Sequence, residues 1–549
     1  MRFAALGDQS ALPSSSGRGK MNETKPVDTG PWAPFRHRAF AFLWVATVIS
    51  NIGTWMHDVG AGWLMTELSP SPLVVSLVQA ATTLPVFLFA IFAGALADLM
   101  DRRKLLISIN LVMAGLASAL SAMVYLQLVT PSILILFTFL MGTCAALMAP
   151  AWQAIVPGLV DKPRLGAAIA LNSMGINVSR AIGPALAGFL IVSAGLVSPF
   201  ALNALSFLGI LGVLFFWKPQ ENVQTMPRER MTGAMRAGLR YVFNSPPVIA
   251  TLIRAVAFFL FASAYWAMLP LIARNMLAGG AQLYGILLAS VGTGAVAGAI
   301  VLPKIKARLG PDKTVMAGTT GTALVMLSFA LVQHPVVAVM ASFIAGASWI
   351  AVLSSLNVST QTALPDWVRA RGLSVFLTLF FGSMSAGSVA WGWLAEQFSI
   401  EMALLTAGVG AIILMIATMR IRLNQGADLD LSPSMHWPEP ILSESAEQDR
   451  GPVMIRISYR INSKDHETFQ QLMTEMRKAR QRHGAYHWGL HQDSTDHDLF
   501  VETWSEGSWI EHLRHHKRVS GADRDIQEKV NRLHLGETNP KVDHLIAVK

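Results

Sequence analysis

Twelve long apolar runs constrain the fold of this chain more than any other feature of its sequence. They lie near residues 39–66, 73–97, 105–127, 131–154, 167–193, 198–217, 247–275, 281–303, 314–333, 335–359, 371–395 and 401–421. A helix needs about 20 apolar residues to cross the hydrocarbon core of a bilayer. Only 14% of the residues are charged, against about 25% in a typical soluble domain. The sequence therefore predicts an all-α, polytopic membrane bundle.

Lysine and arginine are distributed unevenly over the connections between these runs. One alternate set of connections holds nearly all of them, and the opposite set holds almost none except Arg274. Because basic connections face the cytoplasm in most membrane proteins, we expect a multi-pass protein of the inner (plasma) membrane with both termini in the cytoplasm. The net charge of +9 comes from short basic clusters, which favour the anionic lipid bilayer over nucleic acid as the partner.

The longest break between runs, residues 218–246, divides the bundle into two six-helix halves at 36–217 and 247–422. Residues 1–35 are rich in Ser, Gly and Pro, and we expect a disordered cytoplasmic tail there. Within the break, Met231, Met235, Leu239 and Val242 share one helical face. This pattern predicts an amphipathic helix that lies on the inner membrane surface or packs against the ends of the bundle, and the two arrangements can coexist.

The composition becomes polar after residue 422. Residues 423–450 contain Pro, Ser and acidic residues and are predicted to form a linker, and 451–549 are long enough for one small cytoplasmic domain. The pattern predicts strands at 453–459, 486–491, 499–504 and 542–548, with helices at 464–482, 506–517 and 520–532. This βαββαβ order is that of a ferredoxin-like α+β domain.

A glycine, a carboxylate and a basic cluster follow one another at the end of the second run. Gly94 and Asp98 precede Arg102 and Arg103. Glycine permits two helix backbones to approach closely, Asp98 can bond helix-end amides or a loop arginine, and the arginines can pair with carboxylates or lipid phosphate. These contacts would hold one half of the bundle against the other and act as a conformational switch. The simpler alternative is that the cluster only follows the positive-inside rule.

The fifth run contains Gly183, Pro184 and Gly188. Proline removes one backbone hydrogen bond and permits a bend, and a bend beside a central cavity would suit export. Glycine and proline are also frequent in membrane helices, so packing alone is the alternative.

Few charged residues lie inside the predicted spans, and these are the candidates for substrate binding or coupling. Arg180 lies near mid-bilayer, where an arginine costs at least about 2.5 to 3.5 kcal/mol unless it faces a partner or water. A buried structural pair is the alternative. Arg254 is a weaker candidate, because its side chain can extend to the inner interface. Asp58 is the one plausible proton carrier within a span, with a solvated or arginine-paired aspartate as the alternative, and Asn51 can hydrogen-bond a cargo.

Two of these motifs resemble those of the major facilitator superfamily. Residues 94–104 resemble its loop 2-3 signature, residues 183–188 resemble its exporter Gly-Pro motif, and residues 51–56 are similar to the enterobactin-exporter-like branch. Leu99 and Asp101 depart from the signature. The resemblance covers about 36–422 and implies a twelve-helix bundle that works by alternating access. It also implies an efflux antiporter that exchanges protons for a siderophore, drug or metabolite.

The arginines and the scarcity of acids inside the spans favour an anionic or polyhydroxylated cargo. The chain contains no Gly-x-x-x-x-Gly-Lys-Ser/Thr loop for ATP phosphates. We therefore expect a transporter rather than an enzyme, driven by the proton gradient.

The C-terminal segment resembles the dimeric α/β-barrel domains of the antibiotic-biosynthesis-monooxygenase type. The resemblance rests on Phe500-Val-Glu502-Thr-Trp504 and on Trp509-x-x-His512. It implies a possible homodimer, and it leaves a membrane-tethered enzyme or sensor as the alternative function. Ten of the fourteen histidines lie at 451–549, but no cysteine or HExxH motif accompanies them. We therefore expect no metal and no cofactor, with a metal or haem site as the less favoured alternative.

Overall fold

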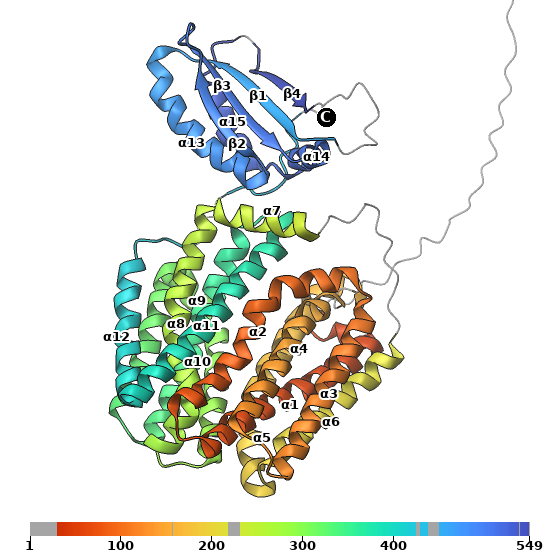
Figure 1. Ribbon diagram of the computed structural model, residues 1–549, viewed down its shortest axis with the longest axis vertical. Coiled ribbons are helices and arrows are strands. Elements are labelled where there is room, and N and C mark those ends of the chain that lie inside the picture. Colours follow the sequence, from red (N-terminus) through yellow and green to blue (C-terminus); the bar gives the residue numbers. More distant parts are fainter. Residues whose placement is uncertain are drawn as a thin grey trace, which may run out of the picture.

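The computed structural model describes residues 30–155, 158–217, 231–423, 429–437, 450–536 and 538–547. It consists of a helical bundle with a small α+β domain at one end (Figure 1). We call the end of the bundle beside this domain the domain side and the opposite end, where α1 ends at Leu68, the far side.

The N-terminal half contains six long helices. After the short helix η1 (Ala33–Arg36), they are α1 (Arg38–Leu68), α2 (Pro72–Leu99), α3 (Arg102–Tyr125), α4 (Pro131–Ile155), α5 (Leu165–Ala194) and α6 (Val197–Phe216). A further short helix, η3 (Lys162–Arg164), precedes α5. The tight connections are capped by side chains: Ser71 accepts a hydrogen bond from the Val74 amide, and Asp101 accepts one from the Lys104 amide. Such caps satisfy amides that a helix start leaves without a partner.

The second half follows α7 (Met231–Phe243). Its long helices are α8 (Pro246–Leu271), which continues as the π-helical turn η4 (Ile272–Met276), then α9 (Ala281–Leu331), α10 (Pro335–Thr362), α11 (Asp366–Gln397) and α12 (Ile400–Thr418). The 51-residue α9 is interrupted at Gly310, whose φ of +73° suits glycine, and Pro311 follows. Eleven described helices are long and apolar enough to cross a membrane. Because α9 contains two crossings, the twelve predicted spans are all present.

Small residues join the two halves between the middle of the bundle and its far side. A Cβ atom added to Gly285 of α9 would lie 2.6 Å from the Pro184 carbonyl oxygen of α5, and one added to Gly392 of α11 would lie 2.5 Å from Cβ of Ser76 in α2. Nearby, Glu396 accepts hydrogen bonds from the Ser71 hydroxyl and from the Leu73 amide. These contacts hold the two halves together on the far side.

The C-terminal domain has the predicted ferredoxin-like topology. Its elements are β1 (Val453–Arg460), η5 (Ser463–Asp465), α13 (His466–His483), β2 (Tyr486–Gln492), β3 (Leu499–Glu506), α14 (Trp509–Arg518), α15 (Gly521–Asn531) and β4 (Lys541–Ile546). The strands form one antiparallel sheet in the order β2-β3-β1-β4. Alternate residues of β1 are buried, as a sheet with one covered face requires.

Helix α7 lies between the bundle and the C-terminal domain (Figure 1). Tyr241 and Val242 are 3% and 0% exposed. A Cβ atom on Gly238 would lie 2.7 Å from Cβ of Arg371 in α11. On the opposite surface, Arg240 Nη1 donates a 2.5 Å hydrogen bond to the carbonyl oxygen of Gly484. Of the two predicted arrangements, the structure therefore shows the helix packed against the bundle ends.

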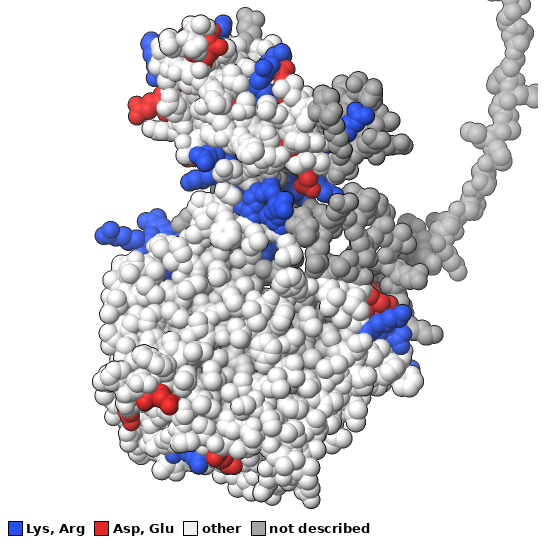
Figure 2. Space-filling view, viewed as in Figure 1, with Lys and Arg blue, Asp and Glu red and all other residues white. Residues whose placement is uncertain are grey.

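Charged side chains are concentrated on the domain side. Figure 2 shows lysines and arginines where the domain meets the bundle, above a bundle surface with few charged residues. This is the side that the distribution of basic residues assigns to the cytoplasm.

The contact between α9 and α10 generates a test of the fold. A Cβ atom on Gly346 would lie 1.9 Å from the Val291 carbonyl oxygen, so Gly346→Val forces the two backbones apart. We expect a lower thermal unfolding midpoint and a lower yield of monodisperse protein in detergent. Gly209→Val is the matched control, because a Cβ atom there meets nothing within 4 Å. Equal midpoints for the two variants would contradict the α9–α10 packing.

Candidate functional site

Arg180 lies about halfway along α5, at the centre of a group of polar side chains. Its Nε is buried and has no hydrogen-bond partner in the described part of the chain. Its guanidinium carbon lies 5.5 Å from the ring centroid of Trp55 in α1. Tyr265 of α8 is close enough to interact with it electrostatically. We call Trp55, Arg180, Tyr265 and Trp266 the Arg180 cluster.

The Arg180 cluster presents hydrogen-bond donors that lack acceptors. The Tyr265 hydroxyl and the Trp266 indole nitrogen are also buried, and neither makes a hydrogen bond of full geometry among the described residues, although the two groups lie close enough to interact with each other. Each unsatisfied buried polar group costs about 1 to 3 kcal/mol. A ligand that brings anionic or hydroxyl oxygens between these donors would offset that cost, and arginine binds such oxygens more strongly than neutral donors do. The cluster is therefore suited to an acceptor-rich ligand.

Aromatic rings of the second half extend from this cluster, a feature that the sequence analysis missed. Trp266 lies 5.4 Å from Trp349 between ring centroids, Trp349 lies 5.3 Å from Phe259, and Phe259 lies 4.2 Å from Phe380. The residues come from α8, α10 and α11. Only the aromatic run in the seventh span hinted at them, because the other rings are far apart in the sequence.

Two other predicted residues share a helix face with Trp55. Asn51, Trp55 and Asp58 follow one another at spacings of four and three residues in α1, which places them on one stripe. Asp58 is half-buried and close enough to Tyr284 of α9 to affect it electrostatically. Asp58 therefore lies where the two halves meet, one turn from Trp55 toward the far side.

Arg254 lies in an ion pair and not in the Arg180 cluster. Its Nη1 donates a 2.6 Å hydrogen bond to Oδ1 of Asp312, just after the break in α9, and a 3.2 Å bond to the Ile421 carbonyl oxygen. The same Asp312 oxygen accepts from the Leu423 amide at 3.1 Å. Arg254 is 3% exposed. Arg254 thus connects α8, the break in α9 and the segment after α12. These contacts neutralise its charge, so a bound cargo is not needed to explain why an arginine lies there.

Arg103 of the predicted switch motif makes its contacts within its own half in this conformation. Arg103 donates hydrogen bonds to the carbonyl oxygens of Leu214 at 2.9 Å and Phe215 at 2.6 Å. It therefore fixes the end of α6 within its own half instead of joining the two halves. A Cβ atom on Gly94 would meet nothing within 4 Å. Arg102 begins α3, and the side chain of Asp98 lies outside the described residues.

The Gly-Pro motif of α5 packs against α1 and α9. A Cβ atom on Gly183 would lie 2.5 Å from Cβ of Trp55, and one on Gly188 would lie 3.0 Å from the Ala281 carbonyl oxygen. Helix α5 continues through Pro184 as one element from Leu165 to Ala194. In this conformation the motif provides close packing, in agreement with the simpler alternative.

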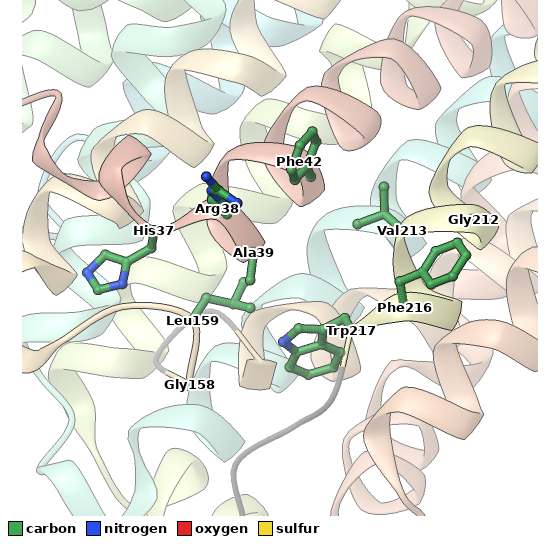
Figure 3. Close-up of a pocket in the computed structure, with 10 residues that line it drawn as sticks. All are labelled: His37, Arg38, Ala39, Phe42, Gly158, Leu159, Gly212, Val213, Phe216 and Trp217. Carbon is green, nitrogen blue, oxygen red and sulfur yellow. The ribbon is translucent and has the colours of Figure 1, made fainter.

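A separate pocket of about 700 Å³ lies at the edge of the N-terminal half on the domain side (Figure 3). It is lined by His37, Arg38, Ala39, Phe42, Gly158, Leu159, Gly212, Val213, Phe216 and Trp217. Phe216 is 90% exposed, which places the rim on the outer surface of the bundle. The pocket is therefore distinct from the Arg180 cluster between the halves.

The C-terminal domain contains a network of buried ionisable groups. Glu506 accepts hydrogen bonds from His512 Nδ1 at 2.9 Å, His515 Nδ1 at 2.5 Å and Trp504 Nε1 at 2.9 Å. Burial opposes ionisation of Glu506, but the two histidines outweigh it and hold the pKa of its carboxyl well below the usual value. Burial lowers the pKa of His515 to about 4. Glu506 is thus ionised at neutral pH and His515 is neutral.

A second part of this network reaches the bundle. Asp523 accepts hydrogen bonds from His483 Nε2 at 2.8 Å and Arg482 Nη2 at 2.7 Å. The His483 ring lies 6.4 Å from that of Tyr241 in α7 and 6.0 Å from that of Trp367 in α11. The guanidinium carbon of Arg518 lies 4.4 Å from the Trp367 ring. The domain is therefore in direct contact with the start of α11.

Residues 429–437, part of the predicted linker, pack against the domain. The amides of Gly521 and Ala522 donate to the carbonyl oxygens of Ser432 and Asp430. Trp437 Nε1 donates to Gln527 at 2.9 Å, and its ring lies 4.8 Å from that of His516.

Comparison with known proteins gives consistent matches. A family model described as "Transmembrane secretion effector" matches residues 29–549. The Staphyloferrin A transporter of Staphylococcus aureus is 24% identical over 405 residues, which cover 72% of this chain and 98% of that protein. The Enterobactin exporter EntS of Salmonella typhi is 25% identical over 389 residues, which cover 69% of this chain and 91% of that protein.

Solved structures show the same bundle. A mutant of the nucleoside transporter NupG has a TM-score of 0.58 at 14% identity, and the match covers 70% of this chain and 99% of that chain. An inward-facing bacterial homologue of the human lysosomal transporter Spinster has a TM-score of 0.52 at 15% identity, over 71% of this chain and 95% of its own. Together with the four-stranded sheet, these matches confirm the predicted fold class.

The Arg254–Asp312 pair generates a stability prediction. Breaking a buried ion pair by removing one partner costs about 3 to 5 kcal/mol, and partial exposure of Asp312, at 33%, reduces that cost. We expect Asp312→Asn to lower the thermal unfolding midpoint of the detergent-solubilised protein, and the exchanged pair Arg254→Asp with Asp312→Arg to recover part of the loss. Asp366→Asn, in an exposed pair with Arg369, is the control. A midpoint for Asp312→Asn equal to that control would rule out a structural role for the pair.

Asp523 generates a pH-dependent prediction. Burial opposes its ionisation, but His483, Arg482 and Ser520 outweigh that effect and hold the pKa of Asp523 well below the usual value. A lowered carboxyl pKa stabilises the folded state above the unfolded-state pKa of about 3.9, and this stabilisation is lost as the pH falls toward the folded-state pKa. Asp523→Asn should lower the free energy of unfolding at pH 7 by at least about 2 kcal/mol.

The measurement is thermal unfolding of the full chain between pH 7 and pH 3. The difference in unfolding midpoint between wild type and Asp523→Asn should shrink below about pH 4, because protonation then begins to remove the stabilising effect of the wild-type carboxylate. Asp525→Asn, an exposed position on the same helix, should match wild type throughout. A difference that stays constant down to pH 3 would show that the charge of Asp523 does not stabilise the domain.

Proposed function

Because the chain belongs to the transmembrane secretion effector family, within the major facilitator superfamily, we propose that it exports a small organic compound of the siderophore class. Membership and the eleven candidate membrane helices make it a multi-pass membrane transporter. Two of the relatives named above carry siderophore names, staphyloferrin A and enterobactin. The observation on which the proposal depends is the Arg180 cluster, whose buried donors come from both halves and make no hydrogen bond of full geometry among the described residues.

The chemistry of the cluster supports this cargo class. Siderophores bind Fe³⁺ through oxygen atoms, so they are rich in anionic or hydroxyl oxygens. Arg180 supplies a positive charge, and the Tyr265 hydroxyl and Trp266 indole supply neutral donors. The rings of Trp349 and Phe380 are buried in this conformation, and we propose that they contact the carbon skeleton of the cargo when the site opens. An organic cation would find no complementary charge in this cluster.

We propose that the protein works by alternating access, because its two halves touch on the far side in this conformation. The far side is closed by α5 with α9 and by α2 with α11, so the site would open toward the domain side in this conformation. We assign the domain side to the cytoplasm, with the protein in the inner membrane, because the basic residues gather there. Export then requires the far-side contacts to separate while the domain side closes.

The switch motif has a role in this cycle. Among the described residues, nothing lies within 4 Å of a Cβ atom placed on Gly94 in this conformation, as expected if its close contact forms only when the domain side closes. We propose that Gly94, Asp98 and Arg102 then hold the halves together. A coupling of a few kcal/mol would be enough to change which state is populated. Arg103 belongs to the same motif, and in this conformation it bonds the end of α6.

We propose protons as the coupling ion and Asp58 as their carrier. Asp58 lies where α1 meets α9, so its protonation would change a contact between the halves. One turn separates it from Trp55 in the Arg180 cluster. Loss or gain of its proton can therefore be linked to cargo binding and to opening of the far side.

The C-terminal domain is proposed to be an accessory of transport. Its contacts with α7 and α11 favour this role over that of an independent tethered enzyme. The domain limits, the resemblance to monooxygenase-type domains and the homodimer stay predictions. Met454 of β1 and Leu545 of β4 lie opposite each other in the sheet, and both are exposed. Exposed apolar residues on the sheet support the predicted homodimer.

Transport by inside-out vesicles tests the proposal. Discharge of a proton gradient would be measured against a panel of siderophores, phenolic acids and cationic drugs. We expect discharge by a siderophore or phenolic acid. Arg180→Gln should raise the concentration for half-maximal discharge at least about tenfold, because one hydrogen bond to a charged group contributes about 1.5 to 3 kcal/mol.

Two controls make the result specific. Arg180→Lys, which keeps the charge, should lie between wild type and Arg180→Gln. Arg532→Gln, at an exposed arginine of the C-terminal domain, should match wild type. Discharge by cationic drugs alone, or an Arg180→Gln variant that handles every compound as wild type does, would overturn the proposed site.

A further inference from the structure

Three histidines of the C-terminal domain converge at one edge of its sheet. His512 and His516 lie on α14, and His544 lies on β4. One ring nitrogen from each lies within 4.8 Å of the others. His512 is buried, and His516 and His544 are half-exposed, so the group can be reached from solvent. We propose that these three imidazoles bind one divalent transition-metal ion of the zinc type.

The distance between two of the nitrogens fits a shared ion. Nε2 of His512 and Nε2 of His516 are 3.1 Å apart. Zinc binds imidazole nitrogen at about 2.0 to 2.1 Å, so two ligands of one tetrahedral ion are separated by about 3.3 Å. A metal ion can therefore lie between these two nitrogens after small rotations of the rings. The ring of His544, 4.8 Å from that of His512 between centroids, can supply the third ligand.

Glu506 orients the first of these ligands. A carboxylate only accepts hydrogen bonds, so the 2.9 Å bond from His512 Nδ1 fixes the proton on Nδ1 and leaves the lone pair on Nε2. That lone pair points toward His516. Metal-binding histidines are commonly held in this way by a carboxylate on the other nitrogen. Glu506 itself is fixed by His515 and Trp504, so the orientation does not depend on the metal.

The facing nitrogens of the group also suit a ligand. Without an ion, one of the two facing Nε2 atoms of His512 and His516 must donate to the other, and the ring of His544 only packs against those of Trp509 and His512. With an ion, three lone pairs are used at once. Three imidazoles suit zinc, iron(II), cobalt(II) or nickel(II) better than calcium or magnesium, which prefer oxygen ligands.

The sequence predicts no metal because helical spacing alone identifies only two of these three histidines. His512 and His516 are one helical turn apart, but His544 is brought to them by the pairing of β4 with β1. Glu506 belongs to β3 and was not recognised as a partner. The site lies in the C-terminal domain and not in the membrane, so a bound ion would be resident rather than cargo.

Metal titration of the full chain tests this inference. Protein purified without a histidine tag would be stripped with EDTA and titrated with Zn²⁺ by calorimetry and with Co²⁺ by visible absorption. We expect one equivalent of each to bind, and Co²⁺ to give the d–d bands of a site with nitrogen ligands. His516→Gln and His544→Gln should each weaken binding at least about tenfold, as should Glu506→Gln through loss of the orienting bond.

A matched control separates the site from other histidines. His497→Gln, at an exposed position of the same domain, should leave affinity and stoichiometry unchanged. Near-ultraviolet circular dichroism would confirm that each variant keeps its fold, and His516→Gln and His544→Gln carry the test if Glu506→Gln does not. Absence of binding in wild type, or binding that is unchanged in both His516→Gln and His544→Gln, would overturn the proposal.

Discussion

Close contact between helix backbones depends on glycine in this protein, because lipid provides no hydrophobic force that drives one apolar helix against another. The contacts differ in what they join. Gly294 and Gly346 bring α9 and α10 together within one half, where a Cβ atom would lie 2.0 Å and 1.9 Å from a carbonyl oxygen. Gly188 and Gly285 join the two halves with somewhat more space. Of these four glycines, the two with the tightest contacts therefore lie within the second half, and the two that join the halves leave more space.

Two arginines inside membrane helices show how the same residue type serves different purposes. Arg254 has a carboxylate and a carbonyl oxygen within hydrogen-bonding distance, so its charge is neutralised by the fold. Arg180 has a tryptophan face and a tyrosine nearby, and its Nε has no acceptor in the described part of the chain. The protein thus offsets only part of the free-energy cost of removing the Arg180 side chain from water. A cargo rich in hydrogen-bond acceptors can offset the rest of that cost. Both residues interrupt apolar runs, and only their partners distinguish them.

The sequence predicts those features that depend on neighbours along the chain. The membrane spans and the strands of the C-terminal domain follow from local hydrophobic patterns, and their limits agree with the helices and strands of the structure within a few residues. Contacts between distant residues could not be predicted. Asp312 is 58 residues from Arg254, and Leu214 is 111 residues from Arg103. The motif around Arg103 indicated a charged contact, but the partner is a helix end in the same half, which no pattern of residues reveals.

The position of α7 connects the bundle to the C-terminal domain. One face of α7 packs against α11 through Gly238, and Arg240 bonds the end of α13. The same α13 end carries His483, which lies against both Tyr241 and Trp367. Because Trp367 lies in the first turn of α11, any tilt of α11 during alternating access must either carry the domain with it or break these ring contacts. The second half of the bundle and the domain are therefore expected to move as one unit relative to the first half.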